Sequence, residues 1–274
     1  MNILPVANAR MYSATPSVKA DWKQLLAWVL KQANLPWEVI DYDAPAPLSV
    51  LWARKDLGLA MMCGLPFAQR PERPTLIAAP VPSPARYAGK PVYFTDIVVR
   101  ADSPHRTLED TFGGVIGYTL ADSMSGGVAL RCHLEAFRKT YCSPQRPRLY
   151  RKTIGGFVNA RNVIEALVAG KINAGPLDSY YHDLLKRNDP AFAAQVRLVA
   201  STAAAPIPPL VATTQLLDAE LSLLRAALLA VSNTPELALV LERLQLSGFA
   251  IADPRSYKVL EEMASNISTP FDDI

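Results

Sequence analysis

Short β-rich runs alternate with helical patterns along almost the whole of this 274-residue chain. Residues 18–33 place large apolar side chains at helical spacing, which predicts an amphipathic helix. Residues 57–63 (LGLAMMC) are instead continuously apolar, which is typical of a buried parallel strand. Because strands that alternate with helices favour parallel sheets covered by helices, the pattern predicts an α/β fold.

The number of predicted strands favours two compact units. The chain is longer than a usual single core, and it has too many strands for one Rossmann-type unit with a tail. We predict that the chain leaves a first lobe near residue 98 and returns near residue 202, which is a hinge architecture. Lobe 1 then comprises residues 1–97 and 203–274, including the C-terminal helices, and lobe 2 comprises residues 98–202.

The charge pattern gives no support for a nucleic-acid partner, and we expect none. The formal net charge is +3, and the Lys and Arg residues are dispersed. No apolar stretch reaches the roughly 20 residues needed to span a bilayer. Residues 1–12 also lack the charged region and long apolar region of a signal peptide, so a cytoplasmic location stays open beside a periplasmic one.

The cysteines and histidines do not form a metal-binding pattern. Cys63, Cys132 and Cys142 show neither a CxxC motif nor metal-type spacing, and the three histidines lie far apart. We therefore expect no metal and no cofactor. Free thiols are the favoured state, although Cys132 and Cys142 could pair in an oxidising compartment.

The segment VIGYTLADSMSGGVAL, residues 115–130, is the most informative for ligand binding. An apolar strand leads into a turn with Ser123, Met124, Ser125 and Gly126, and a helix follows. Serines are favoured helix N-caps, and glycines allow close approach of the backbone to a ligand. The N–H groups and dipole of a helix N-terminus favour an oxyanion. The pattern fits equally well a Ser125 that only caps its helix.

Other predicted strand ends carry further candidate ligand-binding residues. Asn159 can cap the helix after TIGGF, and Arg161 in its first turn can either reach an anion or face solvent. Asp178 ends a strand, where an N-cap role is the commoner one. Open α/β sheets bind ligands beyond the carboxyl ends of their strands. This rule adds two pairs after the first and third strands: Met11 with Tyr12, and Cys63 with Gly64.

The sequence shows no local catalytic motif, and we predict a binding protein rather than an enzyme. GxSxG, P-loop, GxGxxG and HExxH motifs are absent, and Ser125 has no histidine close to it in the sequence. Because distant residues can assemble a site in space, this absence leaves the enzyme alternative open.

The order of these motifs resembles the substrate-binding proteins of phosphate, phosphite and phosphonate ABC transporters, nearly end to end. The resemblance rests on the following segments: Met11-Tyr12, DLGLAMMCGLPF at residues 56–67, FTDIVVR with Asp102-Ser103, the Ser-Xaa-Ser-Gly turn at residues 123–126, and GKINAGPLD at residues 170–178.

The resemblance implies a type II periplasmic-binding-protein fold, with two α/β lobes joined by two hinge strands and a ligand cleft between them. It implies a small phosphonate-, phosphate- or phosphite-like anion held by Ser123 and Ser125 with contacts from Tyr12 and Asp178. It further implies closure by hinge rotation, an ABC permease as partner, a monomer and a periplasmic location. Where the family usually has a histidine, this chain has Ala160, which leaves the identity of the anion open.

Two alternatives share the same fold. A cytoplasmic enzyme similar to menaquinone-pathway lyases or synthases would act on a small carboxylate, and the missing signal peptide favours it. A cytoplasmic sensor domain ranks last, because the chain has no DNA-binding module attached.

Overall fold

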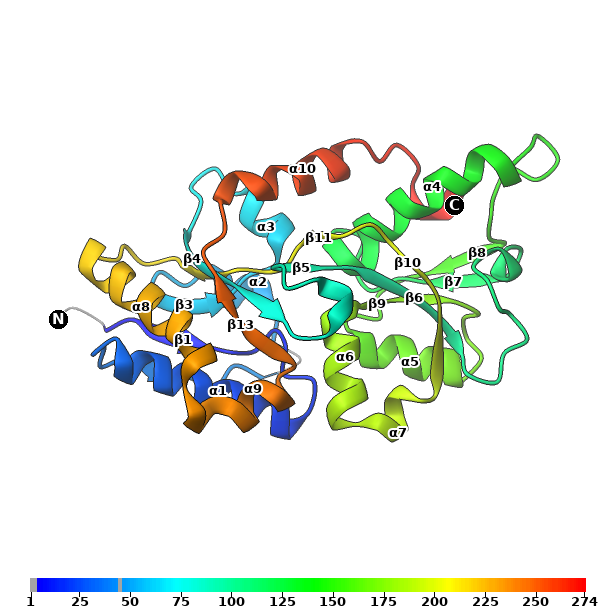
Figure 1. The fold of residues 1–274 in the computed structure, drawn as a ribbon. Helices are drawn as coiled ribbons and strands as arrows, with labels where there is room; N and C mark the ends of the chain where they lie inside the picture. The colour runs from blue at the N-terminus through cyan, green and yellow to red at the C-terminus, as the bar shows by residue number, and fades with distance from the viewer. Residues whose placement is uncertain (1–3, 44–45) are drawn as a thin grey trace. The chain divides into compact units, whose positions relative to one another are not determined.

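The computed structural model describes residues 4–43 and 46–274 (Figure 1). The chain divides into two units: unit 1 is Met1–Val92 with Pro206–Lys258, and unit 2 is Tyr93–Ala205 with Val259–Ile274.

In the described part of unit 1, six strands form one sheet in the order β13-β4-β12-β3-β1-β2. All five residues of β3 are buried, as the apolar run predicted, because β1 and β12 flank this strand on both sides. β1 is parallel to β2 and β3, whereas β12 runs antiparallel to β3 and β4. The sheet is therefore mixed rather than all parallel. The strands are β1 (Val6–Asn8), β2 (Glu38–Val39), β3 (Leu57–Met61), β4 (Thr75–Pro82), β12 (Leu210–Ala212) and β13 (Leu246–Ala250).

Helix α1 (Pro16–Gln32) of unit 1 follows the predicted amphipathic pattern. Thr15 caps it by accepting a hydrogen bond from the backbone N of Val18, and proline occupies the first position. Its apolar face, which includes the fully buried Trp22, packs among neighbours that include α8 and α9 (Figure 1). Each such large side chain contributes about 1.5–3 kcal/mol on burial. The other helices of unit 1 are α2 (Leu48–Trp52), α3 (Gly64–Gln69), α8 (Asp218–Ala230) and α9 (Ala238–Arg243).

Across the described residues, no single helix is long and apolar enough to cross a membrane. One pair of segments, Asp218–Asn233 and Pro235–Arg243, meets the criteria of length and composition together, but it is bent by 75° at its break.

Unit 2 has a three-stranded sheet, β10-β6-β9, and a parallel pair, β7 and β8. α4 lies on one side of these strands, and α5 and α6 lie on the other (Figure 1). The strands are β6 (Thr95–Arg100), β7 (Val115–Gly117), β8 (Lys152–Ile154), β9 (Gly175–Asp178) and β10 (Val196–Ser201). The helices are α4 (Ala129–Tyr141), α5 (Ala160–Val168), α6 (Ser179–Asn188), α7 (Pro190–Ala193) and α10 (Lys258–Ser265).

The chain passes between the units at positions that differ from the predicted ones. The first two passages lie at residues 92–93 and 205–206, within the short strands β5 (Val92–Tyr93) and β11 (Ala205–Pro206), which pair with each other. A third passage follows Lys258. The prediction that the C-terminal residues belong to lobe 1 is wrong for Val259–Ile274, because Phe271 and Ile274 are buried in the core of unit 2.

The three cysteines are free thiols in the structure. Cys132 lies near the start of α4, and Cys142 caps its C-terminus. At 1.5 Å of rise per residue, ten residues of helix separate them by about 15 Å. A disulfide requires Cα atoms within about 7 Å of each other, so the pairing that the sequence left open does not fit this helix.

Candidate functional site

The site predicted in unit 2 lies at the carboxyl ends of β7, β8 and β9. β7 and β8 are parallel and in register from Val115 with Lys152 to Gly117 with Ile154. Ile116 also forms a parallel bridge with Ala174, just before β9. Two loops, at residues 118–123 and 155–159, therefore leave β7 and β8 at one edge and lead into η3 and α5, and β9 passes directly into α6 at Asp178 of the same edge.

The turn after β7 enters a short π-helix, η3 (Met124–Val128), which runs on into α4. Ser123 is the N-cap, and its hydroxyl accepts a hydrogen bond from the backbone N of Gly126 at 3.3 Å. Ser125 lies inside the helix, so the capping role that the sequence allowed for it belongs to Ser123 instead. The backbone N atoms of Gly127 and Val128 both donate to the Ser123 oxygen at 2.9 Å, so the N–H groups that an anion could bind are those that precede Gly126. Binding of an anion at this turn stays a prediction.

Gly126 is required by the tight packing of the turn. A Cβ atom at this position would lie 1.6 Å from the Thr119 hydroxyl oxygen. The backbone N of Thr119 donates to the Gly126 oxygen at 3.2 Å, and the Thr119 oxygen accepts from Gly156 N at 2.9 Å. Thr119 therefore joins the loop that follows β7 to the loop that follows β8.

Asp178 is brought next to the Ser125 segment by Thr95. Thr95 on β6 pairs in register with Asp178 on β9, and its hydroxyl donates to the Ser125 oxygen at 2.8 Å. The Asp178 carboxylate accepts from the backbone N of Tyr180 and of Tyr181, at 3.0 and 3.1 Å. The structure thus shows the N-cap role, and contact of Asp178 with a ligand stays a prediction.

Asn159 and Arg161 both have structural partners. The Asn159 side chain caps α5 by accepting from the backbone N of Asn162 at 3.0 Å. Arg161 forms an ion pair with Asp189 at 2.6 Å, and its guanidinium lies 4.5 Å from the Phe192 ring centroid. Asp189 follows the C-terminus of α6, about 15 Å along that helix from Asp178. These contacts favour a structural role for Arg161, and its contact with an anion stays a prediction.

The four candidate residues of unit 1 lie at one edge of its own sheet. β1 and β3 are parallel, with Asn8 opposite Ala60, so the loops that follow them leave the sheet at the same edge. Met11 and Tyr12 lie in the turn after β1, and Tyr12 is only 2% exposed. In the other loop, Cys63 precedes α3 and the buried Gly64 begins it.

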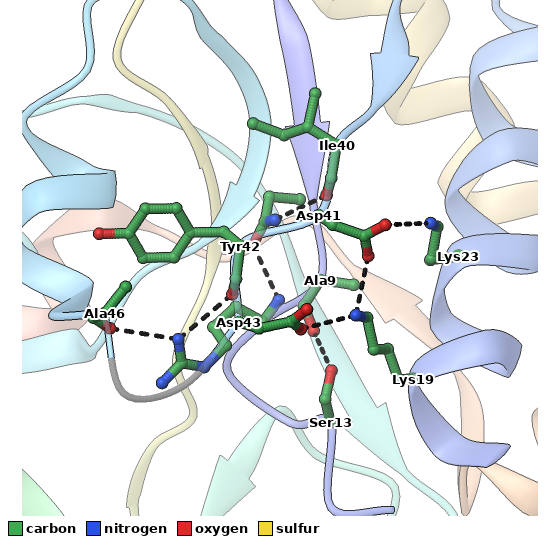
Figure 2. Close-up of polar contacts among 11 residues, drawn as sticks. Ala9, Ser13, Lys19, Lys23, Ile40, Asp41, Tyr42, Asp43 and Ala46 are labelled. Atoms are coloured by element: carbon green, nitrogen blue, oxygen red, sulfur yellow. Dashed lines mark hydrogen bonds and ion pairs between the residues drawn. The ribbon is translucent and has the colours of Figure 1, made fainter. Parts of the chain in front are cut away.

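The turn after β1 is held by a set of polar contacts (Figure 2). The Asn8 amide donates to the Ile40 oxygen at 2.8 Å, and the Ser13 hydroxyl donates to the Ala9 oxygen at 2.8 Å. Arg10, which the sequence analysis did not single out, donates from Nη1 to the oxygens of Tyr42 and Ala46, both at 3.2 Å. These bonds order the segment that carries Met11 and Tyr12.

Charged pairs join α1 to the segment after β2 beside this turn (Figure 2). Lys19 contacts Asp41 at 2.8 Å and Asp43 at 2.6 Å, and Lys23 contacts Asp41 at 3.0 Å. The hydrogen bond from Lys19, and then that from Lys23, lowers the pKa of Asp41. Because these groups are exposed, each pair adds little to stability.

Arg131 is a further residue that the sequence analysis missed. From α4 it donates to the Ala121 oxygen at 2.9 Å, next to the Ser123 turn. Burial lowers the pKa of this guanidinium, but the ordinary pKa of arginine lies so far above neutral pH that the side chain keeps its charge there. No sequence signal marked Arg131, Thr95 or Thr119, because each acts through a contact with a backbone atom.

The arrangement is suited to binding by hydrogen bonds. Within the described chain, no group of three or more His, Cys, Asp or Glu could hold a metal ion. The buried His182 lies 2.8 Å from Asp96, and the Ser201 hydroxyl donates to the same carboxylate at 2.8 Å. A Ser–His–Asp triad has the imidazole between the hydroxyl and the carboxylate. Here the carboxylate is in the middle, so the three residues form a structural network.

These features define a class of protein: an α/β ligand-binding protein whose helix N-termini gather at the carboxyl edges of parallel strands. The model of the family described as "ABC transporter, phosphonate, periplasmic substrate-binding protein" matches residues 12–257. The chain therefore belongs to this family, and it is a solute-binding protein. The resemblance noted in the sequence is confirmed, and the enzyme alternative is not supported.

Solved structures show the same fold. A binding-protein component of an ABC phosphonate transporter from Pseudomonas aeruginosa has a TM-score of 0.74 at 19% identity, covering 95% of this chain and 86% of its own. PhnD1 from Prochlorococcus marinus, in complex with methylphosphonate, has a TM-score of 0.73 at 17% identity, covering 95% and 97%. A Xanthomonas citri protein bound to ATP has a TM-score of 0.62 at 21% identity, covering 96% of each chain.

These similarities confirm the predicted type II periplasmic-binding-protein fold. None of the curated protein sequences compared with this chain gives a significant match.

Proposed function

We propose that this solute-binding protein takes a small phosphorus oxyanion of the phosphonate, phosphite or phosphate class. The observation that carries the proposal is the η3 turn, where a serine-capped helix N-terminus lies at the carboxyl edge of β7 to β9. The head group would accept hydrogen bonds from the Ser123 and Ser125 hydroxyls and from the first N–H groups of the helix. Arg131 adds positive charge beside the turn.

Asp178 restricts which form of the ligand fits. An ionised carboxylate repels an oxyanion unless a proton lies between the two groups. We propose that Asp178 accepts a hydrogen bond from a protonated oxygen of the ligand, while its other contacts cap α6. Methylphosphonate, found in the Prochlorococcus structure, is therefore the first compound to test.

The wider biological role rests on the family. Its members are periplasmic substrate-binding proteins of ABC transporters, which implies a membrane permease as partner. We propose a periplasmic location and a monomer for this chain.

A thermal-shift screen tests the proposed ligand class. The probes are methylphosphonate, phosphite and phosphate, with sulfate, sulfonates and small carboxylates as comparisons. A ligand at about 100 times its Kd stabilises the folded protein by about 2.7 kcal/mol, which raises the Tm measurably. We expect a rise with a phosphorus oxyanion, and a rise only with sulfonates or carboxylates would refute the ligand class.

A further inference from the structure

The C-terminal segment, residues 271–274, packs into the core of unit 2 and contacts residues on both sides of the η3 turn. Phe271 is 6% exposed and Ile274 is 1% exposed, and both lie in the core of this unit. The backbone N of Tyr150 donates to the Ile274 oxygen at 3.0 Å, and the Thr153 hydroxyl donates to the Asp272 carboxylate at 3.3 Å. These contacts attach the segment to β8 and to the residues before it.

Phe271 contacts Tyr118, the first residue after β7. Its ring stacks on that of Tyr118, with centroids 3.7 Å apart and an interplanar angle of 3°. Tyr118 also packs closely on Gly155, where a Cβ would lie 2.0 Å from the Tyr118 ring. Its backbone N donates to the Ile154 oxygen at 2.9 Å. Tyr118 is thus held by contacts from the C-terminal segment and from the loop after β8.

The same ring contacts Arg131, which reaches the turn from its other end. The Arg131 guanidinium carbon lies 4.8 Å from the Phe271 ring centroid. Arg131 in turn donates to the Ala121 oxygen at 2.9 Å. Phe271 therefore touches both Tyr118, which precedes the turn, and Arg131, which follows it on α4.

We propose that Phe271 is a positioning residue for the anion-binding turn, so that the C-terminal segment sets the geometry of Ser123 and Ser125. The inference rests on the proposed function of that turn. A π-helical turn is a rare backbone arrangement, which persists when its surroundings hold it. Removing the aromatic ring would remove one contact from Tyr118 and one from Arg131 at the same time, so part of the cost of ordering the turn would fall on ligand binding.

The test compares Phe271→Leu with Phe271→Tyr, because leucine keeps apolar volume whereas tyrosine keeps the stacking ring. Phe112→Leu is the matched control: it makes the same change beside the same core, where Phe112 packs on Phe137, Tyr141 and Tyr150. The first measurement is amide hydrogen exchange without ligand, followed in residues 119–131 and, for comparison, in α6.

We expect Phe271→Leu to speed exchange in residues 119–131 by roughly tenfold or more while α6 stays as in the wild type. Phe271→Tyr should restore slow exchange, and Phe112→Leu should leave the turn unchanged. Unchanged exchange in the turn of Phe271→Leu would overturn the proposal. An equal increase in α6 would also overturn it, because Phe271 would then stabilise the unit as a whole and not the turn in particular.

The second measurement is the Kd of methylphosphonate by titration calorimetry. We expect Phe271→Leu to weaken binding by roughly fivefold to twentyfold, since the ordering cost falls on the binding step. Wild-type affinity in Phe271→Leu would overturn the proposal. A wild-type protein that binds no phosphorus oxyanion would refute the ligand class instead, and the exchange data would still decide the role of Phe271.

Discussion

At the scale of the residue, the two serines of the turn have different structural duties. The Ser123 hydroxyl accepts a hydrogen bond from Gly126 N, whereas Ser125 is anchored through its backbone oxygen by the Thr95 hydroxyl. Loss of the hydroxyl therefore affects the protein differently at the two positions. Comparing an alanine variant at each position therefore separates the effect of helix capping from the effect of ligand binding.

Ser123→Ala should lower both stability and affinity. The lost N-cap costs about 0.5–2 kcal/mol, and the lost bond to a charged ligand costs about 1.5–3 kcal/mol, or roughly 10- to 150-fold in Kd. Ser125→Ala should weaken binding by a similar factor with little change in Tm. Thermal unfolding and calorimetry with methylphosphonate measure the two effects.

Ser222→Ala is the matched control for both serine variants, because Ser222 is an exposed residue of α8 in unit 1. It should change neither the Tm nor the Kd. Wild-type affinity in both Ser123→Ala and Ser125→Ala would remove the turn from the ligand site.

At the scale of the element, α4 follows the proposed anion-binding turn and packs into the core of unit 2 along its length. Leu130 and Leu134 are fully buried, and Phe137 packs against the same core. His133 lies between these positions, with its ring 5.4 Å from that of Phe137. Burial lowers the pKa of His133 below its ordinary value of 6.5, because desolvation disfavours the charged form.

The pKa shift of His133 predicts a loss of stability in weak acid. The unfolded chain binds a proton at this residue near pH 6.5, whereas the folded protein resists protonation until a lower pH. The contribution of the neutral His133 to the free energy of unfolding is therefore fully present above pH 6.5, and it is lost as the pH falls from 6.5 through the lower pKa of the folded protein. In His133→Leu, the Tm should fall less between pH 7 and pH 5 than in the wild type.

Thermal unfolding across this pH range checks the His133 prediction. Of the other two histidines, His105 lies in a loop and His182 bonds to the buried Asp96. A His105→Leu variant serves as the control and should keep the wild-type slope. Equal slopes for the wild type and His133→Leu would contradict the prediction.

At the scale of the whole molecule, the chain joins its two units through three passages. Two of them are the paired strands β5 and β11, and the third follows Lys258. Each unit has its own sheet and its own buried core, which is the organisation that hinge motion between two lobes requires. The hinge closure that the family resemblance implied remains a prediction.

Ligand binding should reduce the radius of gyration in solution, because closure around the ligand brings the two units together. Small-angle X-ray scattering with and without saturating methylphosphonate measures this change. Ser123→Ala at the same ligand concentration should show a smaller decrease. An unchanged radius in a wild-type protein that demonstrably binds methylphosphonate would contradict hinge closure.

The sequence by itself determined the features that depend on neighbours along the chain. The apolar run at residues 57–63 predicted the buried strand β3, and the spacing of residues 18–33 predicted α1. The order of short motifs also indicated the family, which the family model confirms. Such patterns are local because side-chain periodicity and helix capping involve residues only a few positions apart.

Only the tertiary structure decided which distant residues complete the turn. Thr95 bonds to Ser125, Arg131 to the Ala121 oxygen, and Phe271 stacks on Tyr118. Any threonine hydroxyl can reach a backbone oxygen, and any phenylalanine can fill a core, so residue type alone could not select these partners. The same reason explains why Val259–Ile274 was assigned to the wrong unit: its apolar residues fit either core, and the packed structure places them in unit 2.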